Sequence, residues 1–321
     1  MANNMRKNTQ IQLAIPSNGA LYDPTLKFLS KSGIPVYRSN PRKYSAIIPN
    51  LNGINILFQR TSDITSKVEE GSAELGIVGL DRYLELKEKD SNTSILINDL
   101  KFGGCSLLLE IPNSWIDISS LADLTDLTME FRNKGKVLKI ATKFPRLVKK
   151  HLIENGINHF SLIRSDGTLE VAPEMGFADI IADISSSGTT MRENNLKTIK
   201  GGTILNSQAI LIGNKKILES NKSKLELSQM LINTIESHIY ASESYIITAN
   251  LNVNNSNRLL KKLNSFIDSS DITISEIYNH SKEKLYKLEI MIIKQDLLLV
   301  IKAIKGSGGK NIKVYNPEYI F

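Results

Sequence analysis

The chain has 321 residues, a length that allows about two or three domains. Hydrophobic residues make up 41% and charged residues 23%, which excludes an intrinsically disordered chain. With 40 basic and 33 acidic residues, the net charge of +7 fits nucleic acid, phosphate-bearing small molecules, or simply an evenly basic surface. The single cysteine, Cys105, excludes an internal disulfide framework and a cysteine-rich zinc site.

No stretch of the sequence is both long and apolar enough to span a membrane. The most apolar segment, Leu288 to Ile304, is interrupted by charged residues, whereas a spanning helix needs about 20 mostly apolar residues. The apolar run Ile11–Ile15 is too short for the core of a signal peptide. We therefore expect a cytoplasmic protein without a membrane partner.

Short strands and helices alternate over residues 11–86, as in an α/β layer with a mostly parallel sheet. Strands are predicted at Ile11–Ile15, Ala46–Ile48, Ile54–Phe58 and Leu75–Val78. Helices are predicted at Leu21–Ser32, Thr61–Glu70 and Leu80–Leu86. Ser62 or Asp63 is expected to cap the second of these helices, because both side chains accept hydrogen bonds from free backbone amides.

A long apolar strand, Phe102–Glu110, comes next and is long enough to cross from one domain into another. Asp123–Asn133 is interpreted as a partly polar connector. The alternation then resumes with three strands, a helix and a helical turn: Val137–Ala141, Phe160–Arg164, Ala178–Ile184, Pro145–Glu154 and Leu169–Met175. A second crossing is predicted at Lys197–Ile212, so the sequence favours two α/β lobes with a cleft between them.

The last part of the chain has a different order of predicted elements, which begins with a long helical pattern at Ile217–Ile239. The elements that follow have the order strand, helix, strand, strand, helix, strand: Tyr245–Leu251, Asn257–Phe266, Ile272–Tyr278, Leu285–Ile293, Asp296–Ile304 and Asn311–Tyr315. This βαββαβ order is ferredoxin-like. The predicted domains are therefore lobe I (1–106 with 194–240), lobe II (107–193) and a C-terminal domain (241–321).

The most informative segment surrounds Asp183. This aspartate ends a predicted strand, and open α/β sheets bind ligands at the carboxyl ends of their strands. The residues that follow are rich in hydroxyls: Ser186, Ser187, Gly188, Thr189 and Thr190. A helix is predicted to begin within Met191–Leu196, so free amides and hydroxyls form a candidate phosphate site. With a carboxylate beside it, the site favours a phosphorylated ribose; the alternative is an ordinary helix cap.

These residues resemble the phosphoribosyl-diphosphate loop of the ATP phosphoribosyltransferase family. The family pattern is a glutamate before Val-Ala-Pro, then Gly-x-Ala-Asp, then Asp-x-x-Ser-Thr-Gly-x-Thr. The matching segments are Glu170–Pro173, Gly176–Asp179 and Asp183–Thr190, with Ser187 in place of the threonine. Further segments match in the same order: Ile15–Leu21, Arg60–Ile64, Glu74–Gly79, Phe102–Cys105 and Ile140–Pro145. The tail resembles the regulatory domain of the family's long form.

The resemblance implies transfer of phosphoribosyl from phosphoribosyl diphosphate to N1 of the adenine of ATP, with release of diphosphate, in the first step of histidine biosynthesis. It implies two periplasmic-binding-protein-like lobes around a catalytic cleft and a ferredoxin-like, ACT-like regulatory domain. The implied cofactor is Mg²⁺, the implied inhibitor is histidine, and the implied assembly is a dimer or hexamer without nucleic acid. No magnesium ligand is assigned.

The resemblance also suggests roles for single residues. Asp183 is expected to bind ribose hydroxyls, and Glu170 to contact ribose or adenine unless it only stabilises a helix start. Asp179 is expected in a supporting or magnesium-linked role. The residues expected to hold the 5′-phosphate are Ser186, Ser187, Gly188, Thr189 and Thr190. Arg60 is a candidate phosphate contact or a surface arginine, and Gly19 allows a ligand to approach the backbone.

The first loop departs from the family pattern: Asn18 stands where the family usually has a lysine or a second small residue, and Ala20 where some members have arginine. Arg60, Lys143 or Lys101 is expected to supply the missing positive charge at the diphosphate.

Other protein classes share the two-lobed architecture. A small-molecule binding protein without catalysis would need only the cleft, and an exported one would carry a signal peptide. A ligand-sensing transcription regulator would add a helix-turn-helix before the first strand. A different phosphoribosyltransferase would show two adjacent acidic residues before its phosphate loop, whereas Asp183 is followed by Ile184.

Overall fold

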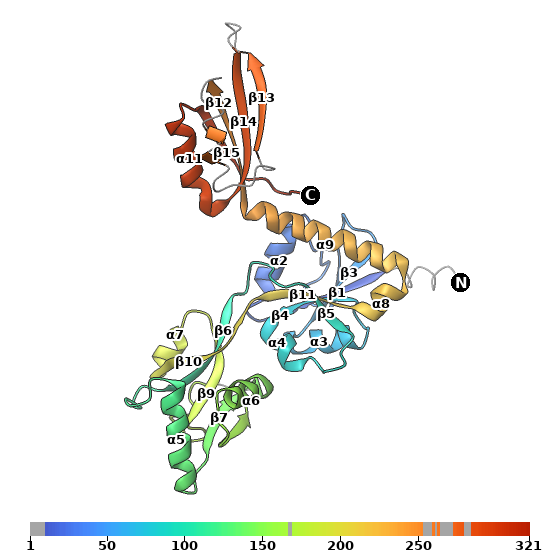
Figure 1. Cartoon of the computed structure of the whole chain (residues 1–321). Coiled ribbons are helices and arrows are strands. Elements are labelled where there is room, and N and C mark those ends of the chain that lie inside the picture. The colour runs from blue at the N-terminus through green and yellow to red at the C-terminus, as the bar shows by residue number, and fades with distance from the viewer. Residues whose placement is uncertain (1–9, 166–168, 253–258, 261, 264–271, 279–283) are drawn as a thin grey trace, which may run out of the picture. The chain divides into compact units, whose positions relative to one another are not determined.

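The structure is a computed structural model that describes residues 10–165, 169–252, 259–260, 262–263, 272–278 and 284–321. The chain divides into two compact units, Met1–Gln229 and Met230–Phe321. Figure 1 labels the helices and strands of both units. Within the described ranges, no helix combines the length and the apolar character that crossing a bilayer requires.

The first unit contains two β-sheets. The first sheet has six strands in the order β2-β3-β1-β4-β11-β5. Their bounds are β1 (Ile11–Pro16), β2 (Ser45–Ile47), β3 (Ile54–Gln59), β4 (Leu75–Gly79), β5 (Thr93–Ile97) and β11 (Ala209–Asn214). β1 pairs in parallel with β3 and β4, whereas β11 runs antiparallel to β4 and β5. Both β4 and β11 are buried throughout, as their unbroken apolar runs require.

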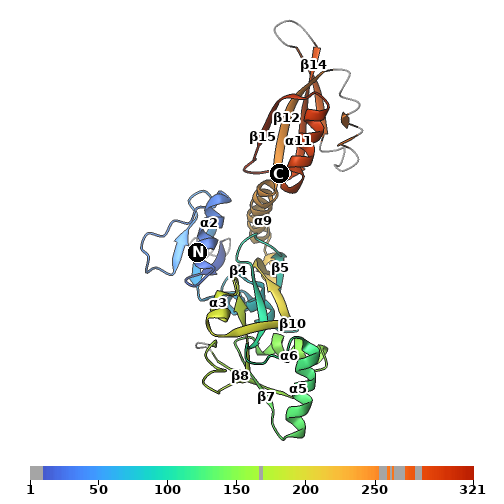
Figure 2. The same ribbon diagram turned by 90° about the vertical axis from the view of Figure 1, so that its left-hand side faces the viewer.

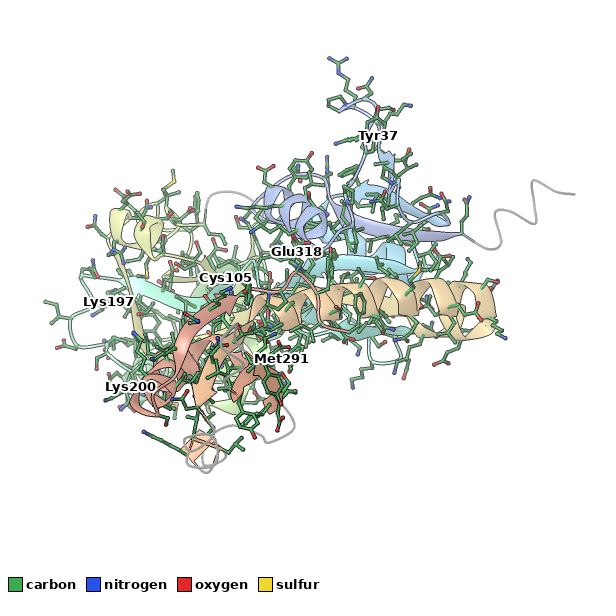
Figure 3. All side chains as sticks on the ribbon, turned by 90° about the horizontal axis from the view of Figure 1, so that it is seen from above. Tyr37, Cys105, Lys197, Lys200, Met291 and Glu318 are labelled. Carbon is green, nitrogen blue, oxygen red and sulfur yellow. The ribbon has the colours of Figure 1, made fainter. Side chains whose placement is uncertain are left out.

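The helices of the first sheet are α2 (Tyr22–Lys31) between β1 and β2, α3 (Thr61–Glu69) between β3 and β4, and α4 (Leu80–Leu86) between β4 and β5. The predicted capping of α3 is wrong, because its N-cap residue is Arg60, which makes no side-chain cap. Ser62 instead donates its hydroxyl hydrogen to Asp63 Oδ1 at 2.7 Å. Beside β2, Tyr37 forms an isolated bridge with Ile47, and its side chain is exposed (Figure 3).

The second sheet has five strands in the order β10-β6-β9-β7-β8. Their bounds are β6 (Cys105–Pro112), β7 (Leu138–Thr142), β8 (Phe160–Arg164), β9 (Ile180–Ser185) and β10 (Leu196–Ser207). β7 pairs in parallel with β8 and β9, so the carboxyl ends of these three strands lie at one edge. The helices of this sheet are α5 (Leu121–Asn133), α6 (Pro145–Glu154) and α7 (Thr189–Glu193). α5 and α6 pack into one core with the strands (Figure 2).

The interpretation of Asp123–Asn133 as a connector is wrong, because this segment belongs to α5. Ser120 and Asp123 form a capping box, in which each side chain accepts a hydrogen bond from the other's backbone amide. Leu124 and Thr128 are buried at the four-residue spacing of one helix face. The polar residues that suggested a connector occupy the other faces of an amphipathic helix.

The chain crosses twice between the two sheets, and the crossing segments are hydrogen-bonded to each other. Leu100 N donates to Ala209 O, and Ala209 N donates to Phe102 O, each at 3.0 Å. β10 pairs with β6 in the second sheet, and after Gln208 the chain enters β11 of the first (Figure 1). The chain therefore passes from the second sheet to the first at Gln208, between β10 and β11.

A second contact between the sheets joins α4 to α6. The buried Glu85 carboxylate accepts hydrogen bonds from the backbone amides of Arg146 and Leu147, each at 3.0 Å. The Arg146 guanidinium donates back to Glu85 O at 2.8 Å. Because Phe144 precedes α6 without a side-chain cap, Glu85 supplies that cap from the other sheet's helix.

The long helical pattern Ile217–Ile239 is two helices, α8 (Lys215–Ser220) and α9 (Lys222–Ser242). Asn214 Oδ1 accepts a hydrogen bond from Ile217 N at the start of α8. Asn221 separates the helices, and its side chain accepts from Lys224 N in the first turn of α9. Each asparagine satisfies amides that a helix start leaves free.

The second unit contains a four-stranded antiparallel sheet in the order β13-β14-β12-β15. Its strands are β12 (Ser244–Asn252), β13 (Ile272–Tyr278), β14 (Lys284–Ile293) and β15 (Lys310–Tyr315), with η2 (Lys294–Asp296) and α11 (Leu297–Gly306) after β14. This strand order confirms the predicted ferredoxin-like domain within an α/β chain. The predicted helix Asn257–Phe266 lies largely outside the described residues; Leu259 and Leu263 are buried in the core.

The contact between α4 and α6 can be tested with Glu85→Ala. The change leaves two amides in the first turn of α6 without their acceptor, so we expect the free energy of unfolding to fall by about 2 kcal/mol. Urea unfolding followed by the fluorescence of Trp115, the single tryptophan, measures it. Glu88→Ala, at an exposed glutamate just after α4, is the control, and equal unfolding midpoints for both variants would contradict the capping role.

Candidate active site

The predicted phosphate loop joins β9 to α7 and is held by its own hydroxyls. Gly188 has φ +69°, a left-handed conformation that favours glycine, and it stands directly before α7. Gly188 N donates to Ser185 Oγ at 3.0 Å, and Ser187 Oγ lies 3.0 Å from Thr189 Oγ1. Arg192 Nη2 donates to Ser187 O at 3.2 Å. These contacts shape residues 185–190 before any ligand binds.

A cavity of about 110 Å³ lies against this loop and brings together most of the predicted site residues. It is lined by the loop and three carboxylates: Glu110, Glu170, Asp183, Ile184, Ser185, Ser186, Ser187, Gly188, Thr189, Thr190 and Met191. Hydroxyls and carboxylates therefore face one small volume. Such a lining offers hydrogen bonds both to a phosphate and to sugar hydroxyls.

Glu110 is a lining residue that the sequence reasoning did not assign to the site. It lies in β6, is only 3% exposed, and pairs across the ladder with Ile181. Asp183 is two residues further along β9 and therefore on the same face of the sheet. Burial, and then the carboxylates of Asp183 and Glu170, raise the pKa of Glu110 to about 7. A single glutamate inside the apolar run 107–111 was the available signal.

Asp183 combines burial with nearby positive charge. Burial is the largest cause and raises the pKa of its carboxyl group. The backbone amide of Ile184 and the charges of Lys143 and Arg82 act in the opposite direction and favour the carboxylate. Lys143 follows β7 at the same edge of the sheet, and Arg82 reaches it from α4 of the first sheet. Arg82 is a basic residue that the sequence reasoning did not select.

Asp179 lies away from the phosphate loop, at the amino end of β9. Its carboxylate accepts a hydrogen bond from Lys139 N at 2.7 Å, and its own amide donates to Lys139 O at 2.9 Å. These bonds tie β9 to β7. Asp179 also lines a separate cavity of about 470 Å³ together with Trp115 and Glu170, so Glu170 borders both cavities.

Arg60 and Gly19 belong to the first sheet. Gly19 follows β1 with φ +77°, and a Cβ built there meets no atom within 4 Å. Arg60 follows β3 and is exposed. β1 and β3 are parallel, so both residues lie at the carboxyl edge of that sheet. Lys101, another candidate for the missing charge, forms an ion pair with Asp99 at 3.3 Å.

Comparisons with known proteins show the family of the chain. The family model described as "HisG: ATP phosphoribosyltransferase" matches residues 60–241. ATP phosphoribosyltransferase 1, chloroplastic, of Arabidopsis thaliana is 35% identical over 321 residues, an alignment that covers 97% of this chain and 78% of that protein. This chain belongs to the ATP phosphoribosyltransferase family. The resemblance stated from the motifs is thereby confirmed, and the chain's length fits the family's long form.

Two further members of the family show how much of the chain is shared. ATP phosphoribosyltransferase of Chelativorans sp. (strain BNC1) is 38% identical over 210 residues, 64% of this chain and 91% of that protein. A solved structure, "ATP phosphoribosyl transferase (HisG:HisZ) complex from Thermotoga maritima", has a TM-score of 0.54 at 23% identity. It covers 71% of this chain and 99% of that chain, which shows a common fold.

The raised pKa of Glu110 predicts how stability depends on pH. The unfolded side chain loses its proton near pH 4.5 and the folded one near pH 7, so the free energy of unfolding falls as pH rises between these values. The full effect is roughly 3 kcal/mol. Urea unfolding across this range measures it. We expect Glu110→Gln to lose most of the slope and Glu154→Gln, at an exposed position of α6, to keep it. An unchanged slope in Glu110→Gln would refute the assignment.

Proposed function

We propose that this chain transfers the phosphoribosyl group of phosphoribosyl diphosphate to N1 of the adenine of ATP, the first step of histidine biosynthesis. The observation that carries the proposal is one cavity in which a hydroxyl-rich loop meets carboxylates, in a chain that belongs to the ATP phosphoribosyltransferase family. The loop suits a phosphate and the carboxylates suit sugar hydroxyls.

In this proposal each part of the site has one task. The amides and hydroxyls of residues 185–190 hold the 5′-phosphate. Asp183 accepts hydrogen bonds from the ribose hydroxyls, and Glu170 contacts the ribose or the adenine. Lys143 and Arg82, whose charges act on Asp183, stabilise the departing diphosphate. Arg60 and Gly19, at the carboxyl edge of the first sheet, are proposed to face phosphates of the substrates.

The reaction needs no covalent intermediate with the protein. The lone pair of adenine N1 forms a bond to the anomeric carbon while the bond from that carbon to the diphosphate oxygen breaks, and its electron pair leaves with diphosphate. Positive charge develops on the ribose ring, and the Asp183 carboxylate stabilises it. The protein also holds two anionic substrates close together in a reactive orientation.

Mg²⁺ belongs to the substrates in this proposal, because diphosphate and triphosphate groups bind it through their own oxygens. The carboxylate and hydroxyl oxygens that line the cavity suit such a complex. The ion offsets part of the negative charge that would otherwise keep the two substrates apart.

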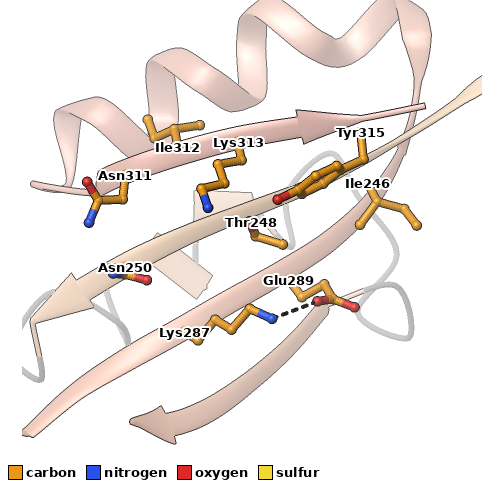
Figure 4. Close-up of a pocket in the computed structure, with 9 residues that line it drawn as sticks. All are labelled: Ile246, Thr248, Asn250, Lys287, Glu289, Asn311, Ile312, Lys313 and Tyr315. Carbon is orange, nitrogen blue, oxygen red and sulfur yellow. Dashed lines mark hydrogen bonds and ion pairs between the residues drawn. The ribbon is translucent and has the colours of Figure 1, made fainter. Parts of the chain in front are cut away.

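The C-terminal domain is proposed to bind histidine and to support a homo-oligomer, as the long-form resemblance implies. Alternate residues of β12, including Ile247 and Ala249, face the core, whereas Ile246 and Thr248 face the opposite side of the sheet. That side borders a cavity of about 870 Å³, shown in Figure 4 with the ion pair of Lys287 and Glu289. The sheet therefore leaves one face available for a ligand or another subunit.

The decisive assay mixes the purified chain with ATP, phosphoribosyl diphosphate, Mg²⁺ and pyrophosphatase and follows phosphoribosyl-ATP. We expect product without a second kind of subunit. Asp183→Asn removes the charge that stabilises the ribose, so we expect kcat to fall by at least about a hundredfold. Asp126→Asn, on the exposed face of α5, is the control. Near-normal turnover in Asp183→Asn would remove this residue from the proposed mechanism.

Inhibition is tested by adding histidine to the same assay, with an equal concentration of arginine as the control. We expect histidine, but not arginine, to lower the initial rate by binding to the C-terminal domain, away from the active site. Light scattering with and without histidine measures the size of the oligomer. An unchanged rate together with an unchanged size would contradict a regulatory role for this domain.

A two-lobed binding protein without catalysis is the competing function. It would bind phosphoribosyl diphosphate through the same loop but form no phosphoribosyl-ATP. The assay above separates the two functions, because only the enzyme consumes both substrates.

A further inference from the structure

Glu110 is an unusual residue for its place in the fold. It is a glutamate in the second sheet's strand β6, and its neighbours Leu107, Leu109 and Ile111 are fully buried in the core. Because side chains alternate along a strand, Glu110 points to the opposite face, where it lines the cavity beside the phosphate loop. A buried carboxyl group at this position faces the proposed substrate and not the apolar core.

The cavity of about 110 Å³ brings Glu110 together with two other carboxyl groups, those of Asp183 and Glu170. Several carboxylates that share a small, partly desolvated volume repel one another, so one of them keeps its proton. Burial and the charge of Glu170 also raise the pKa of Asp183, but the amide of Ile184 and the charges of Lys143 and Arg82 oppose that shift. Glu110 is only 3% exposed. Its burial and the charges of both other carboxylates raise its pKa to about 7.

We propose that Glu110 is an additional substrate-binding residue, a neutral carboxylic acid that donates a hydrogen bond to an oxygen of the phosphoribosyl group. Asp183 acts as the complementary acceptor. The inference rests on the proposed function, since it names a further contact at the same site. A neutral acid offers a donor that phosphate and sugar oxygens accept, whereas an ionised Glu110 would repel the phosphate. The proton stays on Glu110 throughout the reaction.

The charged groups at this site come from several elements. Asp183 of β9 and Glu170 of the turn before β9 act on Glu110 itself. Lys143 after β7 and Arg82 of α4 act on Asp183, and Arg192 of α7 donates a hydrogen bond to the phosphate loop. The two carboxylates favour the neutral form of Glu110, and the basic groups act mainly on Asp183 and on the loop. Binding of phosphoribosyl diphosphate should therefore weaken as pH rises above about 7, when Glu110 loses its proton.

The experiment compares the wild-type chain with Glu110→Gln, which keeps a hydrogen-bond donor of similar shape and cannot ionise. Calorimetric titration with phosphoribosyl diphosphate and Mg²⁺ gives the Kd from about pH 6 to about pH 8.5. We expect the wild type to lose affinity by up to about tenfold per pH unit above pH 7 relative to Glu110→Gln. Titration of the ligand's own phosphates affects both proteins equally, so the ratio of their Kd values isolates Glu110.

Two further variants complete the test. Glu110→Ala removes the donor, and we expect it to bind about tenfold or more weakly than the wild type at pH 6. Glu154→Gln, an exposed glutamate of α6, is expected to follow the wild-type profile. Circular dichroism establishes that each variant is folded; if Glu110→Ala is not, the comparison with Glu110→Gln decides alone.

The results that overturn the inference are distinct from those that overturn the proposed function. Parallel pH profiles for the wild type and Glu110→Gln, in an enzyme that forms phosphoribosyl-ATP, would refute only the role of Glu110. A wild-type chain that neither binds phosphoribosyl diphosphate nor forms product would refute both. If the Kd of Glu110→Gln rises less steeply above pH 7 than the Kd of the wild type, the result supports the proposed donor.

Discussion

The hydrogen bonding between the two crossing segments is the constraint on which the first unit depends. Ala209 exchanges backbone hydrogen bonds with the segment that leads into β6, so the two connections are held as one ribbon. Gly103 is part of this ribbon, and a Cβ there would lie 2.5 Å from a methyl group of Leu21. The fixed connections allow α4 to reach α6. A charge on α4, that of Arg82, then acts on Asp183 in the other sheet.

Asp183 and Glu110 carry the same carboxyl group, and the surroundings of each decide whether it accepts or donates a hydrogen bond in the proposed site. Burial raises the pKa of Asp183, but its positive neighbours and an amide donor oppose that shift. Glu110 is more buried and faces other carboxylates, which favour its proton. Such a pair offers an acceptor and a donor within one cavity, from two residues that are both acids in solution. The phosphate loop needs no charge of its own, because its amides and hydroxyls are already oriented by local hydrogen bonds.

Much of this organisation could be predicted from the sequence, because the strands are short apolar runs and the loop is a local motif. Residues 183–190 are contiguous, so their shared cavity follows from one strand end. The helix α5 was missed because its apolar positions are spaced among polar ones, and only the capping box marks its start. Asp179 lies only a few residues from Asp183 in sequence, but at the opposite end of the same strand.

The residues missed at the site have long-range neighbours. The glutamate stands out in the apolar run 107–111, but only the pairing of β9 with β6 brings Glu110 beside Asp183. Arg82 acts on Asp183 only because α4 meets the second sheet, and no local periodicity indicates that contact. Their positions depend on the crossing geometry, which a single sequence without a structure does not specify.

The placement of β11 has a consequence for how the chain folds during synthesis. This strand lies between β4 and β5 of the first sheet, yet it leaves the ribosome only after the whole second sheet. Until then the edges of β4 and β5 that face β11 are unpaired, and such apolar edges favour association with other chains. The N-terminal half of a nascent chain therefore needs protection until β11 emerges. β11 lies far in sequence from β4 and β5, with which it pairs. Contacts between segments far apart in sequence form slowly, so we expect slow folding.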